Sequence, residues 1–151
     1  MSTAIVRQAV LSDLDALTPL FDGYRQFYER ATDLGAAREF LAARFNHNES
    51  VLFIAHEGEV AVGFTQLYPS FSSAALERVF VLNDLFVQDF ARGKGVAKKL
   101  LEAATHHASS VGAVRLTLST AITNTTAQFV YEAAGWKRDK QFYVYHFPVQ
   151  G

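Results

Sequence analysis

The segment FARGKGVAKKLL, residues Phe90–Leu101, places two glycines among four basic residues where an apolar-periodic stretch begins. Glycine is a poor residue for the middle of a helix, but a helix start offers about four unpaired N–H groups and the positive end of the macrodipole. Glycine also lets the backbone come close to a ligand. The segment therefore predicts a pyrophosphate site at a helix start. A solvated basic helix start, whose glycines serve only the turn, is the alternative.

The better-known phosphate-binding motifs do not fit this segment. A dinucleotide fingerprint would need a glycine at Lys98 and should open the first βαβ unit of the chain. A Walker loop needs Gly-Lys-Ser/Thr, whereas the chain has Gly93-Lys94-Gly95. Any phosphate held here is therefore held by another kind of loop.

Composition limits the class of protein. With 151 residues, 50% of them apolar, the chain predicts one domain over residues 1–151 with a hydrophobic core. Acidic and basic residues nearly cancel, 15 against 14, which argues against nucleic acid or an anionic membrane as partner. The absence of cysteine excludes disulfides, thiolate zinc sites and cysteine nucleophiles. His106 and His107 are adjacent, so they point apart on a helix, and we expect no metal site.

The N-terminal stretch carries Arg7, Asp13 and Asp15 and lacks the apolar core of a signal peptide. No apolar run approaches the roughly 18 residues needed to cross a bilayer. We therefore expect a cytoplasmic protein with no membrane partner.

Hydrophobic periodicity predicts an α/β sheet in the order β-α-α-β-β-β-α-β-α-β-β. Ser12 is expected to cap the first helix and Asn124 the last, and Asp139 is expected to lie near the turn of a final strand pair. The expected strands are residues 3–10, two strands joined around 57–59, 78–87, 113–120 and a pair within 136–147. The expected helices begin near residues 12, 36, 96 and 124.

Two motifs carry a resemblance to a known family. RGKGVA, residues 92–97, resembles the R/Q-x-x-G-x-G/A acetyl-coenzyme A signature of the GNAT N-acetyltransferase superfamily, and it follows the strand LNDLFV as it does in that family. NTTAQFVYEAAGW, residues 124–136, resembles the family segment N-x-x-A-x-x-x-Y-E-x-x-G-F. The resemblance covers nearly the whole chain. It implies a mixed central sheet of about six to seven strands, splayed between the fourth and fifth strands and flanked by about four helices.

The resemblance also implies how acetyl-CoA would be held. The splayed strands would take the pantetheine arm, the glycine loop would take the pyrophosphate, and the last helix would contribute its capping residue. The residues implied for the cofactor are Leu85, Phe86, Val87, Arg92, Gly93, Lys94, Gly95, Val96, Ala97, Lys98 and Asn124.

Transfer of an acetyl group to an amine requires a neutral amine, a stabilised oxyanion and a proton for the departing thiolate. By the resemblance, Tyr131 is the general acid and the N–H of Val87 the oxyanion donor; as a plain helix residue, Tyr131 would be a half-buried aromatic. The nearest pattern is the polyamine and diamine acetyltransferase branch, which has Glu-Asp where this chain has Asn83-Asp84. Either Asp84 or ordered water acts as base, or the amine arrives neutral.

Residues of a strand alternate between its faces, so Asn83 and Asp84 are expected on opposite sides. Asp84 could instead be a structural carboxylate. The resemblance implies substrate contacts for Tyr28, Glu29, Asn83 and Asp84, although Glu29 could be a solvated helix charge. Tyr24, Phe71 and Phe86 are expected to form an aromatic wall beside the acceptor.

The sequence thus predicts an acetyl-CoA-dependent N-acetyltransferase that acts on a primary amine of a small molecule, such as a di- or polyamine or an amino acid, by direct attack in a ternary complex. The alternatives are an acetyltransferase for protein or peptide lysine or N-terminal amines and a non-catalytic acyl-CoA sensor. The aromatic segment 141–147 could pair across a homodimer.

Overall fold

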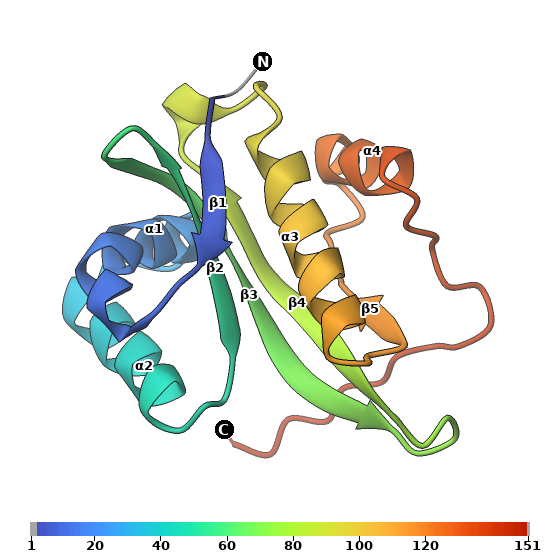
Figure 1. Cartoon of the computed structure of the whole chain (residues 1–151). Helices are drawn as coiled ribbons and strands as arrows, with labels where there is room; N and C mark the ends of the chain where they lie inside the picture. The colour runs from blue at the N-terminus through green and yellow to red at the C-terminus, as the bar shows by residue number, and fades with distance from the viewer. Residues whose placement is uncertain (1–2, 151) are drawn as a thin grey trace. The chain divides into compact units, whose positions relative to one another are not determined.

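The computed structural model describes residues 3–150, and the chain forms two compact units (Figure 1). The first unit extends to Ser119 and contains the sheet. The second begins at Thr120 and contains one helix and the C-terminal segment.

The sheet of the first unit has five strands in the order β1-β2-β3-β4-β5. All neighbours are antiparallel except β4 and β5, which are parallel. The turn predicted around residues 57–59 is formed between β2 and β3, with Gly58 at a φ of 60°. The strands are β1 Ile5–Gln8, β2 Val51–Glu57, β3 Val60–Ser72, β4 Glu77–Val87 and β5 Arg115–Thr117.

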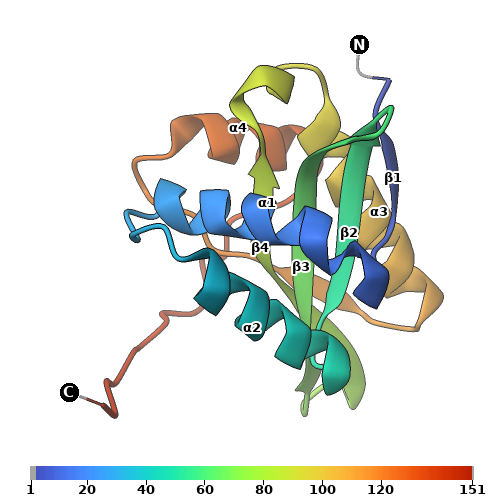
Figure 2. The ribbon, with the colours of Figure 1, turned by 90° about the vertical axis from the view of Figure 1, so that its left-hand side faces the viewer.

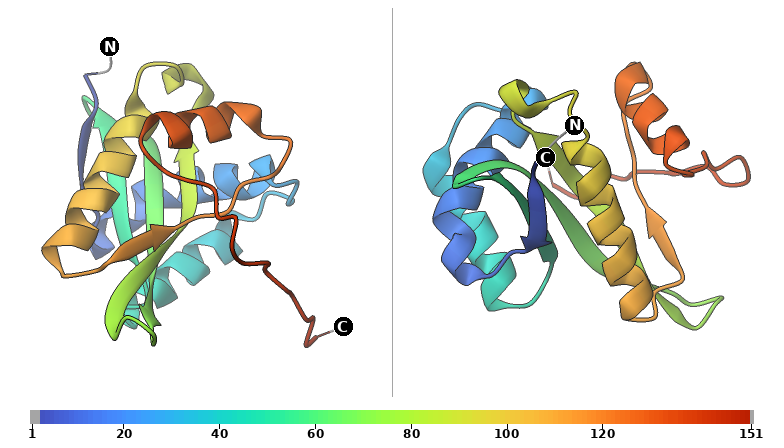
Figure 3. Two further views of the ribbon diagram at one scale, coloured as in Figure 1. Left: turned by 90° about the vertical axis from the view of Figure 1, so that its right-hand side faces the viewer. Right: turned by 45° about the horizontal axis from the view of Figure 1, so that its top comes forward.

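Helices cover both faces of this sheet. Helices α1 (Leu14–Phe27) and α2 (Leu34–Asn46) lie on one face, as Figure 2 shows, and α3 (Val96–Ser110) lies on the other (Figure 3). The apolar stripe of α1 is buried against β3, where Phe21 meets the ring of Phe64 edge-on at 6.1 Å between ring centres. Burial of such side chains is the main favourable term for this layer packing.

The first helix does not start as predicted. Ser12 lies in a short 3₁₀ turn, Leu11–Asp13, and α1 begins only at Leu14. The side chain that fixes this entry is Asp13, which accepts hydrogen bonds from Arg7 at 2.7 and 2.8 Å and from the Val10 N–H at 2.8 Å. The hydrogen bonds from Arg7 lower the pKa of Asp13. A carboxylate paired across the turn therefore replaces the expected serine cap.

The parallel strands β4 and β5 separate soon after they meet. They pair only from Val79 to Val81 on β4, opposite Arg115 to Thr117 on β5. Beyond Val81, β4 continues to Val87 with only β3 as a described neighbour in the sheet. The splay expected between the fourth and fifth strands is confirmed.

The second unit contains α4 (Thr125–Ala133), whose start is capped as predicted: the Asn124 Oδ1 accepts a hydrogen bond from the Ala127 N–H at 3.1 Å. The final strand pair was wrongly predicted, because residues 136–150 contain no strand. The turn expected near Asp139 is present, and in it the Gln141 N–H donates to Asp139 Oδ1 at 3.0 Å. A two-stranded ribbon alone is marginal in water, and the Tyr143 and Tyr145 side chains are about nine-tenths exposed (90% and 88%).

The mixed α/β architecture with four α-helices among the described residues is therefore confirmed, and the sheet has five strands instead of six to seven. No helix in residues 3–150 combines the length and the apolar character needed to cross a membrane.

Candidate functional site

The glycine segment lies where β4 passes into α3 (Figure 3). After a short 3₁₀ turn, Asp89–Ala91, Gly93 and Gly95 adopt φ values of 74° and 85°, and Gly95 is the N-cap residue immediately before α3. Side chains with a β-carbon rarely take up this left-handed region. The two glycines are thus required by the backbone of the loop itself.

The space in front of this loop is open. A β-carbon built on Gly93 or Gly95 would meet no atom within 4 Å. Within residues 3–150, none of the backbone N–H groups from Gly93 to Lys98 donates a hydrogen bond. Six donors at the positive end of a 15-residue helix, facing open space, form a cradle suited to an anion such as a pyrophosphate.

The basic residues around the cradle fall into two pairs. Arg92 is engaged by its own loop: Nε donates to the Val87 carbonyl at 2.7 Å, and the guanidinium pairs with Asp89. Lys99 donates to the Ala4 carbonyl of the N-terminal segment at 2.8 Å. Lys94 and Lys98 are exposed and form no salt bridge within the described chain. Arg92 therefore shapes the loop, whereas the charges of Lys94 and Lys98 are exposed beside the cradle.

The C-terminal half of β4 presents backbone groups toward the splay. The Gln88 N–H donates to the Val62 carbonyl at 2.8 Å, which points Gln88 toward β3. Because backbone groups alternate along a strand, Leu85 and Val87 turn theirs away from β3, toward the open edge. Phe86 pairs with Phe64 of β3, so only its ring can contribute to the site. The ring packs tightly against Gly23 of α1, since a β-carbon at that position would lie 2.9 Å from it.

A β-bulge re-aims the two polar residues of β4. Gln66 of β3 is opposite Asp84 and Leu67 is opposite Leu82, so Asn83 is an extra residue without a partner. The expectation that Asn83 and Asp84 face opposite sides was wrong, because the bulge breaks the alternation. The Asn83 amide is exposed and donates to Asp84 Oδ1 at 2.8 Å.

Asp84 is a buried carboxyl group with a raised pKa. Its exposed fraction is 1%. Burial raises its pKa to about 6, and the hydrogen bonds from Asn83 and Gln66 oppose this rise only in part. Gln66 Nε2 donates to Asp84 Oδ2 at 2.6 Å. The carboxyl group can therefore exchange a proton near neutral pH.

Gln66 and Tyr68 belong to the same polar cluster as Asp84, and neither was predicted from the sequence. Gln66 is completely buried, and its Oε1 atom has no hydrogen-bond partner among the described residues. Tyr68, two residues further along β3, has its pKa raised to about 12 by burial and by the charge of Asp84. The sequence feature that could have indicated this cluster is the pair Thr65-Gln66, two polar residues in the middle of an otherwise apolar buried strand.

Aromatic side chains of α1 adjoin the bulge. The Tyr24 hydroxyl donates to the Asn83 carbonyl at 3.0 Å, and the Tyr24 and Tyr28 rings lie 5.0 Å apart. Glu29 follows the end of α1 with a φ of 64°, so it is a residue of the turn and not of the helix. The structure thus brings Tyr28 and Asn83 to the same region as Asp84.

Phe71 does not belong to this aromatic group. It is opposite Arg78 at the far end of the β3–β4 hairpin, seven residues along β3 from Phe64. The expectation that Phe71 shares a wall with Tyr24 and Phe86 was therefore wrong, because the strand is longer than the spacing suggested.

In the second unit, Tyr131 lies on α4, and its ring is 6.1 Å from that of Trp136 at an interplanar angle of 50°. The Trp136 N–H donates to the Tyr131 carbonyl at 3.0 Å, which closes the turn after the helix. Asn124 and Tyr131 thus belong to one capped helix of the second unit.

In residues 3–150, no three His, Cys, Asp or Glu side chains gather as a metal site would require. The features available for chemistry are an anion cradle, an open strand edge and a buried carboxyl group with a pKa near 6. Together these suit acyl transfer assisted by a general base.

Comparison with known proteins agrees with this geometry. Residues 15–136 match the Acetyltransferase (GNAT) family. An uncharacterized N-acetyltransferase of Bacillus subtilis, YhfO, is 48% identical over 140 residues, covering 93% of this chain and 94% of the relative. A crystal structure of a probable acetyltransferase has a TM-score of 0.92 and 42% identity, with 97% of this chain and 99% of the other covered.

A more distant solved structure shares the fold alone. It is the aminoglycoside N-acetyltransferase AAC(6')-Iy in complex with CoA, with a TM-score of 0.80 and 23% identity over 97% of this chain and 96% of the other.

Proposed function

The chain belongs to the GNAT acetyltransferase family and is an N-acetyltransferase, and from this premise we propose that it moves an acetyl group from acetyl-CoA to a primary amine of a small molecule, by direct attack in a ternary complex. The observation that carries the proposal is the buried carboxyl group of Asp84, with a pKa of about 6, on the strand that leads directly into the glycine cradle.

The cradle supports acetyl-CoA as the co-substrate. The N–H groups of Gly93 to Lys98 would bind the pyrophosphate, and Lys94 and Lys98 would add charge. The backbone of Leu85 and Val87 would bind the pantetheine arm as an added strand would. The thioester of acetyl-CoA supplies the activated acetyl group. A relative in fold, the aminoglycoside enzyme, was solved with CoA.

Asp84 would act as general base. A free alkylamine has a pKa near 10.4, so fewer than about one molecule in a thousand is neutral at pH 7. With an exposed fraction of 1%, Asp84 would receive the proton through a water molecule and not by direct contact. Gln66 supports this relay, because its buried Oε1 atom lacks a donor that such a water would provide.

Two groups would complete the reaction. The Val87 N–H, turned toward the splay, would donate to the oxyanion that develops on the acetyl carbonyl. Tyr131 would protonate the departing thiolate, as the resemblance of its segment implies. No cysteine is available to form an acyl-enzyme, which favours direct attack.

The acceptor would lie beside the bulge of β4. Tyr24 and Tyr28 offer aromatic faces to an ammonium group. Asn83 and Glu29 offer polar contacts next to them. We propose a di- or polyamine, an amino acid or a similar metabolite. The aminoglycoside enzyme, similar in fold, also acts on a small molecule with amino groups.

A thiol-release assay with a panel of small amines tests the proposal, with a lysine peptide and an N-terminal peptide as further acceptors. Turnover with at least one small amine is expected. Turnover with peptides alone would replace the acceptor class. Tight CoA binding without turnover on the whole panel would favour an acyl-CoA sensor, since the chain has Asn83 where the polyamine branch has glutamate.

The exposed aromatic segment 141–147 supports a homodimer in which this segment pairs with its copy. We also propose that the protein acts in the cytoplasm, with neither nucleic acid nor membrane as a partner. Light scattering coupled to gel filtration would measure the mass, and a monomer at all concentrations would contradict the dimer.

A further inference from the structure

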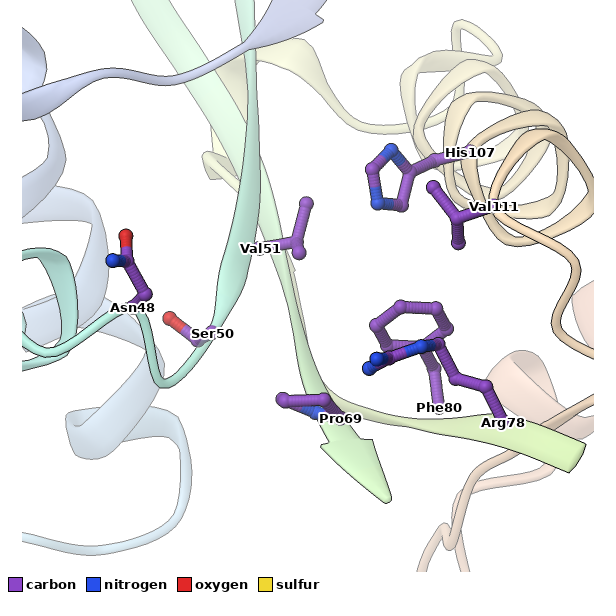
Figure 4. A pocket seen from close by; sticks show the side chains of 8 residues that line it. All are labelled: Asn48, Ser50, Val51, Pro69, Arg78, Phe80, His107 and Val111. Carbon is purple, nitrogen blue, oxygen red and sulfur yellow. The ribbon is translucent and has the colours of Figure 1, made fainter. Parts of the chain in front are cut away.

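A hollow lies on the α3 face of the first unit, away from the glycine cradle. It has a volume of about 380 Å³, near the lower end of the range for small-molecule sites. It is formed at the end of α3 that is remote from Gly95, and no residue of the acetyl-transfer site lines it. The residues that line it are Asn48, Ser50, Val51, Pro69, Arg78, Phe80, His107 and Val111 (Figure 4).

One wall carries a guanidinium group without an acidic partner. Figure 4 shows the Arg78 side chain reaching toward the middle of the hollow. Its guanidinium lies 5.0 Å from the centre of the Phe71 ring and forms no salt bridge within the described chain. The Arg78 carbonyl accepts from the Val114 N–H at 2.9 Å, which fixes the backbone. A planar guanidinium held this way suits a carboxylate, which it can bind through two parallel hydrogen bonds.

The opposite wall carries the polar side chains of Asn48 and Ser50. The Ser50 Oγ atom is buried and makes no hydrogen bond within residues 3–150. Asn48, beside it, has a φ of 52°, which fixes the turn between α2 and β2. The lining contains no acidic residue, and the nearby Glu49 is paired with Arg44 at 3.2 Å.

The base of the hollow is aromatic. The rings of Phe80 and His107 lie 5.7 Å apart, and Phe53 holds His107 from the other side at the same distance. Burial, and then the charge of His106, lowers the pKa of His107, so its ring is neutral at pH 7. The Val51 and Val111 side chains complete an apolar surface. Such a surface favours a flat apolar group.

We propose that this hollow binds a small aromatic carboxylate, with the carboxylate on Arg78 and the ring against Phe80 and His107. The guanidinium without an acidic partner and the lining without acidic residues favour a negatively charged ligand. The aromatic floor of the hollow favours a ligand with a planar ring. The proposal concerns binding alone and is independent of the acetyl acceptor.

Benzoate is the probe, and benzyl alcohol, with the same ring but no charge, is its control. Titration of the ¹⁵N-labelled full chain should shift the amide resonances of residues 48–51, 78–80 and 107–111, with a dissociation constant on the order of millimolar for so small a ligand. Benzyl alcohol should bind at least about tenfold more weakly, because it lacks the charge-assisted hydrogen bonds. Equal binding of the two, or shifts confined to other residues, would overturn the proposal.

Arg78→Gln should weaken benzoate binding by about tenfold or more, whereas Arg38→Gln, on an exposed arginine paired with Asp15 on α1, should leave it unchanged. Val111→Trp, at a half-exposed position, should block the hollow by bulk without loss of charge. The unfolding midpoint of each variant is measured first. If R78Q loses its fold, V111W decides; benzoate binding by a folded V111W with the wild-type constant would overturn the assignment.

Discussion

Replacing Asp84 by asparagine should slow catalysis while making the protein more stable at pH 7. The substitution keeps the volume of the side chain. Both carboxylate oxygens now accept hydrogen bonds, one from Asn83 and one from Gln66. An amide at position 84 can keep its oxygen on the Gln66 Nε2 donor, and its NH₂ group then faces the exposed amide of Asn83, which can turn over to accept. The variant should therefore fold with its hydrogen bonds made.

The stability gain follows from the pKa of Asp84. Its rise from 3.8 to about 6 means that the ionised carboxylate disfavours the folded state. At about 1.4 kcal/mol per pKa unit, the full effect above pH 6 is about 3 kcal/mol. This penalty is absent below pH 3.8, where the group is protonated in both states, it grows between pH 3.8 and about 6, and it is fully present above pH 6. Asp84→Asn removes it, so the gain in stability is present at pH 7 and vanishes near pH 4.

Catalysis should change in the opposite direction. A positioned general base contributes about 10²–10⁴-fold, so kcat of Asp84→Asn should fall by a factor in that range. In the wild type, kcat should rise as the pH increases through about 6, because only the ionised carboxylate accepts a proton, and this limb should be missing in the variant. The assays are thiol release from acetyl-CoA between pH 5 and 8 and thermal unfolding at pH 4 and 7.

Asp22 provides a matched control. It is also buried, but its pKa is lowered: burial tends to raise it, and the hydrogen bonds from Thr32, the Asp33 N–H and Gln26 outweigh that effect. Its ionised form stabilises the fold at neutral pH and loses this effect as the pH falls, so Asp22→Asn should destabilise the protein at pH 7. A lower Tm for Asp84→Asn at pH 7, or a wild-type pH profile, would refute the reasoning about Asp84.

Three further variants test the rest of the site. Gly95→Val should raise the dissociation constant of CoA about tenfold or more, because the side chain would occupy the open cradle. Gly58→Val is the control, since it carries the same strain at positive φ in a hairpin and should leave CoA binding unchanged. Isothermal titration would measure both constants. Tyr131→Phe should lower kcat about tenfold or more with little change in the KM for acetyl-CoA, and an unaltered kcat would remove the acid role. Gln66→Met should shift the rising limb of the kcat profile to higher pH, because it deletes the 2.6 Å hydrogen bond to the Asp84 carboxylate; an unmoved limb would show that this bond does not tune the base.

The glycine loop could be predicted from the sequence because its signal is local. Gly93 and Gly95 are needed by φ values that the loop itself imposes, and α3 begins immediately after them. Asn124 was predictable for the same reason, since a helix cap depends on residues three positions apart. Ser12 failed because Arg7, five residues earlier, pairs with Asp13 and sets the entry to α1 instead.

The polar cluster around Asp84 could not be predicted, because it depends on pairing between strands. Whether Asn83 and Asp84 lie on opposite sides or together is decided by the bulge, which arises only when β4 pairs with β3. The role of Gln66 could not be predicted for the same reason: it is 18 residues from Asp84 along the chain, yet its Nε2 atom lies 2.6 Å from Asp84 Oδ2. The final strand pair failed because alternating aromatic residues specify a strand only when a neighbouring surface buries one of its faces.

Two of the buried aspartates, Asp22 and Asp84, differ in the sign of their effect on the free energy of folding, and this difference separates a structural role from a functional one. A carboxylate kept for the fold is expected to gain donors until its pKa falls, as Asp22 of α1 does with three hydrogen bonds, two of them from the α1–α2 connection. Asp84 has two donors and still has a raised pKa, in a cluster where the neighbouring Gln66 keeps an acceptor unpaired. Folding alone gives no reason to retain such a group, because an asparagine or a leucine would cost less to bury. The penalty becomes useful when a proton must be taken up near neutral pH, which is what the attack of an amine on a thioester demands.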